Sequence, residues 1–254
     1  MDTRLLERVK CCAPQWLRYL LALSEIARAG TGWVVASGDE VALFDAEGRT
    51  IMPLWPSAEL AAEMPVDGGL PTPVPVAELT GRLLPSLGED ALVAVFPAGG
   101  DNTLVAPADV ARDIEGFSAD PRDIAAEILA EPVAAPLSEL AMIEAPDMSA
   151  FAPPEGGEAA LVVLLGEEGG VIGLVAEEGP ALLLFADEAH ALAFRARTEA
   201  PAEPVALSAD ALVNGWLLLA FSAGWGIATL DDPAVASVMT PARCALEFTE
   251  RWRA

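Results

Sequence analysis

Two short stretches decide the fold of this 254-residue chain, LWPSAE at residues 54–59 and LFADEA at residues 184–189. Each has the pattern of a strand end, then an aromatic residue, then a polar residue suited to cap a helix. The predicted caps are Ser57 and Asp187. Because the same local signal occurs twice, about 130 residues apart, we predict that one supersecondary unit is present twice.

Short strands are predicted before each stretch, because apolar runs alternate there with turn signals. The predicted ranges are Trp33–Ala36, Val41–Phe44 and Thr50–Leu54 in the first half, and Leu161–Leu165, Val171–Ala176 and Ala181–Phe185 in the second. We interpret the first three strands as an antiparallel meander. A helix is predicted after each meander, over residues 58–64 and 187–197.

Two further pairs of segments support the repeat. Pro75–Ala77 corresponds to Pro204–Ala206, and Phe96–Gly100 corresponds to Phe221–Trp225. An N-terminal helix over residues 3–29 is expected to break at Pro14. The other predicted elements are helices at residues 76–84, 107 onward, 121–130, 137–143, 209–214 and 242–252, and strands at residues 92–96, 104–106, 216–221 and 227–230.

These elements predict an α+β fold with two related modules. A meander has one apolar face, and a helix laid on that face buries it. We therefore expect each module to be a mainly antiparallel sheet with helices packed on one face. The predicted boundaries are residues 1–130 for the first module, 131–157 for a Pro- and Gly-rich linker, and 158–254 for the second module and its terminal helix.

The charge balance is the extreme feature of the composition. Against 39 acidic residues there are 14 Lys and Arg, which gives a formal net charge of -25. Nucleic-acid phosphates and anionic membrane surfaces repel such a chain, whereas a basic protein surface attracts it. We therefore predict no nucleic-acid partner and no membrane insertion. The acidic residues are spread along the chain, so a solvated, solubilising surface is the alternative interpretation.

The sequence also favours a cytoplasmic location. No apolar run approaches the ~18 to 20 residues that a spanning helix needs. The first ten residues lack the apolar core of a signal peptide. The three cysteines, Cys11, Cys12 and Cys244, are too few and too poorly spaced for a disulfide framework, so we expect reduced thiols.

Residues of catalytic type are each weighed against a structural role. His190 is expected to be a partly exposed helix residue, since a general base needs an orienting carboxylate and a nearby nucleophile. Adjacent Cys11 and Cys12 fit a packed helix better than a metal site, although a redox role stays open. Asp231 is expected to cap a helix begun at Pro233.

Paired acids and glycine turns also favour structural roles, because adjacent acids in a turn point apart and neither glycine turn opens a phosphate-binding loop. These segments are Glu167–Glu168, Glu177–Glu178, Asp231–Asp232, Gly99–Gly100 and Gly224–Gly226. We therefore predict no catalytic residue, no metal ligand and no cofactor site.

Three tryptophans are the candidate partner-binding residues. If Trp33 and Trp55 lie at the ends of adjacent strands, they could form the floor of a groove, with core packing as the alternative. Trp225, beside a glycine turn, is a further candidate. Tryptophan combines a large apolar area with one hydrogen-bond donor, which suits a docking surface.

The quoted segments also resemble known families. Trp33, the Met52–Pro56 segment and Val95–Pro97 make the first module similar to the bacterial domain-of-unknown-function family 2750. The second module resembles the N-terminal domain of SseB-type (enhanced serine sensitivity) proteins. The residues that carry this second resemblance are Leu183–Glu188, Pro204–Val205 and Phe221–Gly226. The resemblance supports the fold and implies no active site, because neither family brings an assigned one.

Taken together, the sequence favours a non-enzymatic interaction or adaptor protein, such as a secretion-associated or immunity-like binder. Its acidic surface would steer it to a protein partner with a basic surface. The alternative is a small-molecule-binding or enzymatic protein that uses a cleft between the two modules. A pocket with His190, a cysteine and a carboxylate would favour the enzyme.

Overall fold

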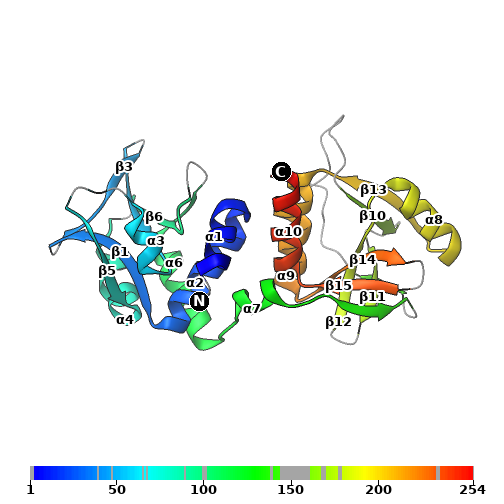
Figure 1. Ribbon diagram of the computed structural model, residues 1–254, viewed down its shortest axis with the longest axis horizontal. Coiled ribbons are helices and arrows are strands. Elements are labelled where there is room, and N and C mark those ends of the chain that lie inside the picture. Colours follow the sequence, from blue (N-terminus) through cyan, green and yellow to red (C-terminus); the bar gives the residue numbers. More distant parts are fainter. Residues whose placement is uncertain are drawn as a thin grey trace. The chain divides into compact units, whose positions relative to one another are not determined.

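The chain forms two compact units, Met1–Ala126 and Glu127–Ala254 (Figure 1). The computed structural model describes residues 3–38, 40–46, 48–64, 66, 68–88, 90–98, 102–137, 140–143, 161–166, 170–176, 179–232 and 235–253. The fold is α+β, with three mostly antiparallel sheets and helices against them, as the sequence predicts.

The first unit opens with two helices, α1 (Thr3–Cys12) and α2 (Gln15–Ala29), and Pro14 between them confirms the predicted break. Two sheets follow. One has the order β2 (Glu40–Val41), β1 (Thr31–Ser37), β5 (Leu70–Pro75), and the other β3 (Phe44–Ala46), β4 (Arg49–Leu54), β6 (Leu92–Val95), β7 (Thr103–Val105). The predicted single meander is wrong, because the chain changes sheet between β2 and β3 and β4 pairs with β6 in parallel.

The helices of the first unit cover these sheets. They are α3 (Ala58–Ala62), α4 (Val76–Glu78), a π-helical turn at Leu79–Leu83, α5 (Leu84–Ser86) and α6 (Pro107–Ala119); α7 (Ile124–Leu129) crosses the boundary between the units. α2 packs beside α6, where the Tyr19 hydroxyl donates to the Asp113 carboxylate at 2.6 Å. Burial and this hydrogen bond raise the pKa of Tyr19 well above its usual range.

The second unit holds one large sheet. Its order is β13 (Ala202–Leu207), β10 (Leu161–Gly166), β11 (Val171–Ala176), β12 (Gly179–Leu184), β14 (Gly226–Asp232), β15 (Val235–Met239), β8 (Val133–Pro136), with β9 (Leu140–Ile143) also on β11. Only the β12–β14 pair is parallel among these described pairings. The helices are α8 (Glu188–Thr198), a π-helical turn at Ala211–Trp216, α9 (Leu217–Ala223) and α10 (Pro241–Arg253).

The two units repeat the same order of elements. In each, a first strand pairs antiparallel with the strand after the capped helix, and the strand before that helix pairs in parallel with a later one. A π-helical turn lies between those two strands in both units. A final helix follows the last hairpin of each unit, α6 in the first and α10 in the second. The predicted internal repeat therefore has a matching topology.

The residue that ends the central strand makes the same backbone bridge in each unit. Trp55 exchanges two N–H···O=C hydrogen bonds of 2.9 Å with Trp33, and Phe185 exchanges two of 2.9 Å with Val162. Both predicted caps are also present. The Ser57 hydroxyl accepts from the backbone amide of Leu60 at 3.4 Å, and the Asp187 carboxylate accepts from that of His190 at 2.9 Å.

The other two repeat anchors are wrong in register or in element. Pro204 lies inside β13, opposite Leu164, whereas Pro75 ends β5. The predicted strand at 216–221 is helical, so Phe221 does not correspond to Phe96. A continuous apolar run does not distinguish a buried strand from a buried helix, and here α9 is buried against α10 and β14.

Three further predictions fail in the second unit. The segment predicted as a linker at 131–157 contains β8 and β9, which pair with β15 and β11, because their apolar residues find partners in the large sheet. The predicted helix at 137–143 is thus a strand in its last four residues. Asp231 lies in β14 and caps no helix, since β15 follows. Gly99–Gly100, Glu167–Glu168 and Glu177–Glu178 lie outside the described residues.

Among the residues described, no helix combines the length and the apolar character needed to cross a membrane. The core of the second unit is instead a sheet face covered by helices. Val162, Leu164, Leu183 and Phe194 are among its buried residues.

Gly173 gives a direct test of this packing. It lies in β11 between β9 and β12, where a Cβ atom would come within 2.2 Å of the Ile143 side chain and 2.5 Å of the Ala181 carbonyl oxygen. We expect Gly173→Ala to lower the free energy of unfolding by ~1–3 kcal/mol in urea titrations. Gly116→Ala in α6, where nothing lies within 4 Å, is the control and should be neutral or slightly stabilising. Equal stability of the two variants would contradict the pairing of β9 with β11.

Candidate functional site

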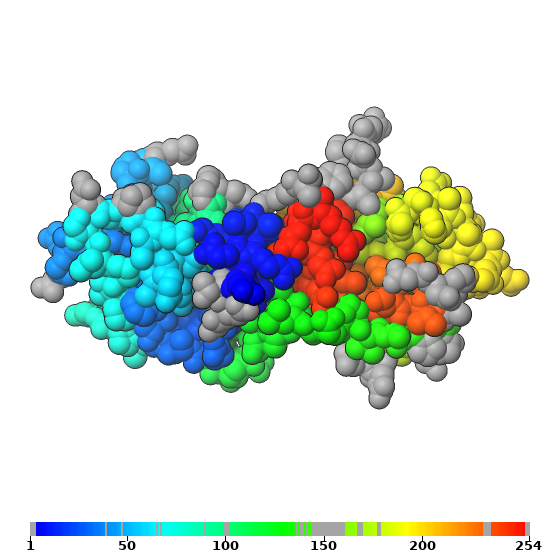
Figure 2. Space-filling view, viewed as in Figure 1, coloured from blue at the N-terminus to red at the C-terminus, as the bar shows by residue number. Residues whose placement is uncertain are grey.

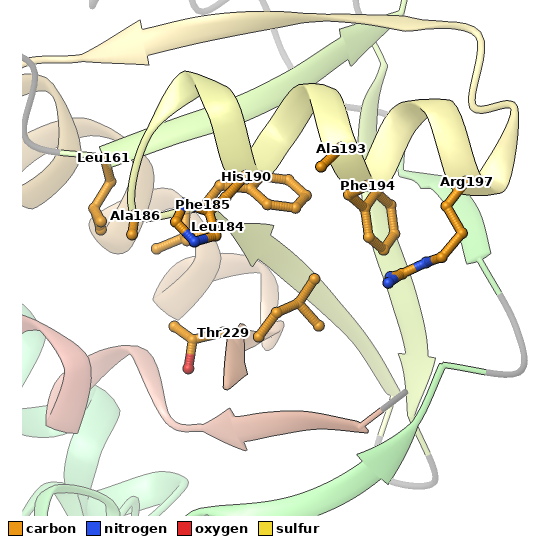
Figure 3. Close-up of a pocket in the computed structure, with 10 residues that line it drawn as sticks. Leu161, Leu184, Phe185, Ala186, His190, Ala193, Phe194, Arg197 and Thr229 are labelled. Carbon is orange, nitrogen blue, oxygen red and sulfur yellow. The ribbon is translucent and has the colours of Figure 1, made fainter. Parts of the chain in front are cut away.

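A pocket of about 440 Å³ lies wholly within the second unit, at the carboxyl ends of its parallel strands (Figure 3). Its lining is mostly apolar and includes Leu161, Leu184, Phe185, Ala186, His190, Ala193, Phe194, Arg197, Thr229 and Leu230. A pocket of this size, with an apolar lining and a few polar groups, is typical of a binding site.

The local fold explains why the pocket lies there. β12 ends at Leu184 beside Thr229 of β14, and the Phe185 bridge carries the chain across to β10. Asp187 then starts α8, which is exposed on the surface of the second unit and drawn in yellow in Figure 2. The pocket is therefore the space between the start of a helix and two parallel strand ends.

Two phenylalanines form its inner wall. The Phe185 and Phe194 rings lie with centroids 5.2 Å apart at 56°, a tilted arrangement that favours ring edge on ring face. Each ring is 2% exposed, so both are held by the core behind them. Because the wall is fixed by packing, the pocket is built before any ligand arrives.

His190 has the orienting carboxylate that the sequence analysis treated as missing. Its Nδ1 lies 2.7 Å from the Asp187 carboxylate, which only accepts, so Nδ1–H is the donor and Nε2 is left for another group. Hydrogen bonds from the His190 amide and ring lower the pKa of Asp187 below its usual range. The His190 side chain is still 68% exposed, in agreement with the predicted exposed helix residue.

Arg197 is the unpaired cation of the pocket. Its guanidinium lies 5.5 Å from the centre of the Phe194 ring and turns back toward that ring in Figure 3. Within the part of the chain that the structure describes, it makes no ion pair, whereas Arg195 pairs with Glu203 and Arg243 with Glu247. An arginine stacked on a ring keeps its N–H groups for a carboxylate or phosphate.

The first unit has a pocket of about 310 Å³ at the equivalent place. Counted from the two capping residues, Leu60 replaces His190, Glu63 replaces Ala193 and Met64 replaces Phe194. Trp55 stands where the second unit has Phe185. Lys10 also lines this pocket, but it forms an ion pair with Glu63, which raises the pKa of Lys10. The positive charge of Lys10 in this pocket is therefore neutralised by Glu63.

The predicted partner-binding tryptophans do not form one surface patch. Trp55 is only 3% exposed, so it is packed in the core and offers a partner little area. Trp33 is half-buried on β1 and is bridged to Trp55, so the expected adjacency is present, and Trp55 does line a pocket. Trp225 is half-buried in the second unit, just after α9.

The cysteines do not contribute to either pocket. Cys11 is exposed on α1, Cys12 is half-buried, and Cys244 is buried in α10, where desolvation raises its pKa to about 12. Neither a cysteine nor a serine lines the His190 pocket, and no metal-binding cluster of His, Cys, Asp or Glu occurs among the residues described. No cysteine is therefore found beside His190 and Asp187 among the described lining residues of this pocket.

Sequence reasoning missed Phe194, Arg197 and Thr229 as site residues. Phe194 and Arg197 lie seven and ten residues after the cap, which places them on successive turns of one helix. That spacing could have indicated a shared face. Thr229 could not have been found, because its place depends on the parallel pairing of β14 with β12.

No protein-family model, curated protein or solved structure matches the chain. The resemblances to family 2750 and to SseB-type proteins therefore stay predictions, and the geometry of the two pockets carries the functional conclusion.

The burial of Trp55 predicts a structural role. Trp55→Ala should lower the free energy of unfolding of the first unit by ~3–5 kcal/mol, the usual cost of removing a buried aromatic side chain. Trp55→Phe, which installs the residue found at the equivalent position of the second unit, should recover most of that loss. The measurement is urea unfolding followed by circular dichroism. A Trp55→Ala protein as stable as the parent would show that Trp55 is not part of the core.

The Asp187 cap predicts an acid-sensitive helix. Because its folded pKa is lowered, the carboxylate adds stability that is present above its unfolded pKa of about 4 and is lost as the pH falls through the lowered value. Asp187→Ala should therefore destabilise the second unit near neutral pH and flatten the acid limb of its stability profile. Asp187→Asn keeps a capping oxygen and should lose less stability. Thermal unfolding from about pH 7 to about pH 2 tests this, and an unchanged acid limb in Asp187→Ala would contradict it.

Proposed function

We propose that the chain is a non-enzymatic interaction protein that docks a protein partner with a basic surface. The observation that carries this proposal is the charge. The whole chain has a net charge of -25, and residues 127–254 contain five arginines against twenty acidic residues, a net charge of -15. A surface of this sign attracts a basic partner over long range and repels nucleic acid. We keep a cytoplasmic location as part of the proposal.

The cations of the chain are too few to neutralise its acids. Several described cations are taken up by neighbouring acids, as in Arg82 with Glu78, Arg112 with Asp109 and Arg195 with Glu203. These pairs are exposed, so each adds little stability, and because each uses one acid and one cation the net charge is unchanged. The remaining acids, such as Glu188 and Glu199 at the two ends of α8, are exposed.

Charge alone does not hold a partner, because an exposed ion pair contributes only about 0 to 1 kcal/mol. The anchor has to be apolar, and the His190 pocket is the recess that the second unit offers for it. The same pocket favours a second candidate function, the binding of a small molecule, for which the mostly apolar lining and three polar side chains are the supporting observations.

Association kinetics test the proposed function. A partner isolated by affinity purification is mixed with the protein in a stopped-flow instrument. The association rate constant should fall at least ~tenfold between low salt and about 0.5 M salt, because salt screens steering charges. The dissociation rate constant should change much less.

Charge variants on α8 supply the matched control. Glu188→Gln combined with Glu199→Gln removes two exposed charges and should slow association, while Ala196→Gln changes an exposed, uncharged position of the same helix and should not. If association is indifferent to salt and to the two glutamates, the acidity serves solubility only and the proposed function is wrong.

A further inference from the structure

We infer that the His190 pocket receives the carboxyl-terminal residue of a basic polypeptide. The apolar side chain of that residue would lie against lining residues that are not fully buried, such as Leu161, Ala193 and Leu230, and its free carboxylate would pair with Arg197. This inference rests on the proposed function, because it names the part of the basic partner that is anchored.

Arg197 is the residue that would bind the terminal carboxylate. It is one of only five arginines among residues 127–254, and in the described part of that unit it lines the pocket without a carboxylate partner. Glu203 of β13 pairs with Arg195, two residues before Arg197 on the same helix. A guanidinium held over an aromatic ring presents its N–H groups in a geometry that suits a carboxylate.

The lining of the pocket suits an apolar side chain. Beside Arg197 the pocket is walled by apolar side chains, with Leu161, Leu184 and Leu230 around the two phenylalanine rings. A site built in this way accepts a group that is apolar at its body and anionic at one end. A cavity of about 440 Å³ has room for one large side chain with its terminal carboxylate, and not for a folded surface.

His190 adds a third contact. Since its Nδ1–H donates to Asp187, its Nε2 is an acceptor in the neutral ring, and no partner for it is found in the residues described. A backbone amide of a bound chain is a donor of the right kind. Arg197 and His190 are seven residues apart on α8, about 10 Å along the helix axis, so the carboxylate of a chain end would pair with Arg197 and a backbone amide upstream of it would donate to His190.

The long-range charge selects a basic polypeptide over a free anion. A net charge of -15 on residues 127–254 repels a free anionic ligand before it reaches Arg197. A chain with lysines or arginines upstream of its last residue is attracted instead, and those side chains meet exposed acids such as Glu188. The carboxylate then pairs with Arg197 at short range through charge-assisted hydrogen bonds.

The first unit supplies an internal comparison. Its pocket has the same position but contains Glu63, which already pairs with Lys10. A carboxylate entering there would meet a carboxylate and a cation that is already neutralised. We therefore assign the chain-end site to the second unit alone.

The test uses a fluorescent peptide with three lysines followed by a carboxyl-terminal phenylalanine, and the same peptide as its carboxyl-terminal amide. Fluorescence polarisation with the full chain should show that the free acid binds about tenfold more tightly, as expected when one charged hydrogen-bonding pair is lost. Arg197→Gln should abolish this preference. Arg195→Gln makes the same change two residues away, at an arginine that pairs with Glu203, and should preserve it.

Each further outcome separates the inference from the proposed function. If acid and amide bind equally but binding weakens with salt, the chain-end site is wrong and the basic-partner function stands. If binding is indifferent to salt, or if an otherwise identical peptide with glutamates in place of lysines binds as well, the basic-partner function is wrong. If N-acetylphenylalanine alone competes at the concentration of the peptide, the pocket is a small-molecule site and the inference is overturned.

Discussion

Two backbone hydrogen bonds, made once in each unit, position everything around the pockets. Trp55 bridges to Trp33, and Phe185 bridges to Val162, with four N···O distances of 2.9 Å. The bridge holds the end of the central strand against the first strand, so the following helix has to start over the carboxyl ends of the parallel pair. The aromatic ring at the bridge is then buried, and the hollow beside it remains.

The repeated scaffold separates what the fold requires from what the site uses. Both units keep the aromatic residue, the capping oxygen and the parallel strand pair, since these fix the backbone. The residues that follow the cap differ freely, with Leu60 and Glu63 in one unit and His190 and Ala193 in the other. In the pocket of the first unit, Lys10 forms an ion pair with Glu63. The pocket of the second unit is lined by Arg197.

How far the sequence predicts this arrangement depends on the range of the interactions. The caps at Ser57 and Asp187 and the break at Pro14 were predictable because each depends on a few adjacent residues. The helix at Leu217–Ala223 was mistaken for a strand because its apolar run is continuous, and its packing against α10 and β14 is not visible in the sequence. The role of Arg197 could not be predicted, because the sequence does not show which arginine of this helix pairs with an acid from another element. In the structure Glu203 pairs with Arg195. Trp55 was predicted to contact a partner, but it is buried, because it bridges to Trp33 on another strand.

The acidity of the chain and the arginine of the second unit's pocket act over different distances, which is why the two features are compatible. The field of many acids extends about one Debye length, ~8 Å at physiological ionic strength, and acts on a partner before contact. A guanidinium against a ring acts within hydrogen-bonding distance, where a charge-assisted pair is stronger than a neutral one. A surface that is acidic throughout would hold a basic chain in many registers, because exposed pairs are weak and interchangeable. One cation in an apolar recess fixes a single register, since only a group with an apolar body and an anionic end satisfies both the wall and Arg197. In the proposed function, the acidic charge would set the rate of encounter with a basic partner, and Arg197 would set the specificity.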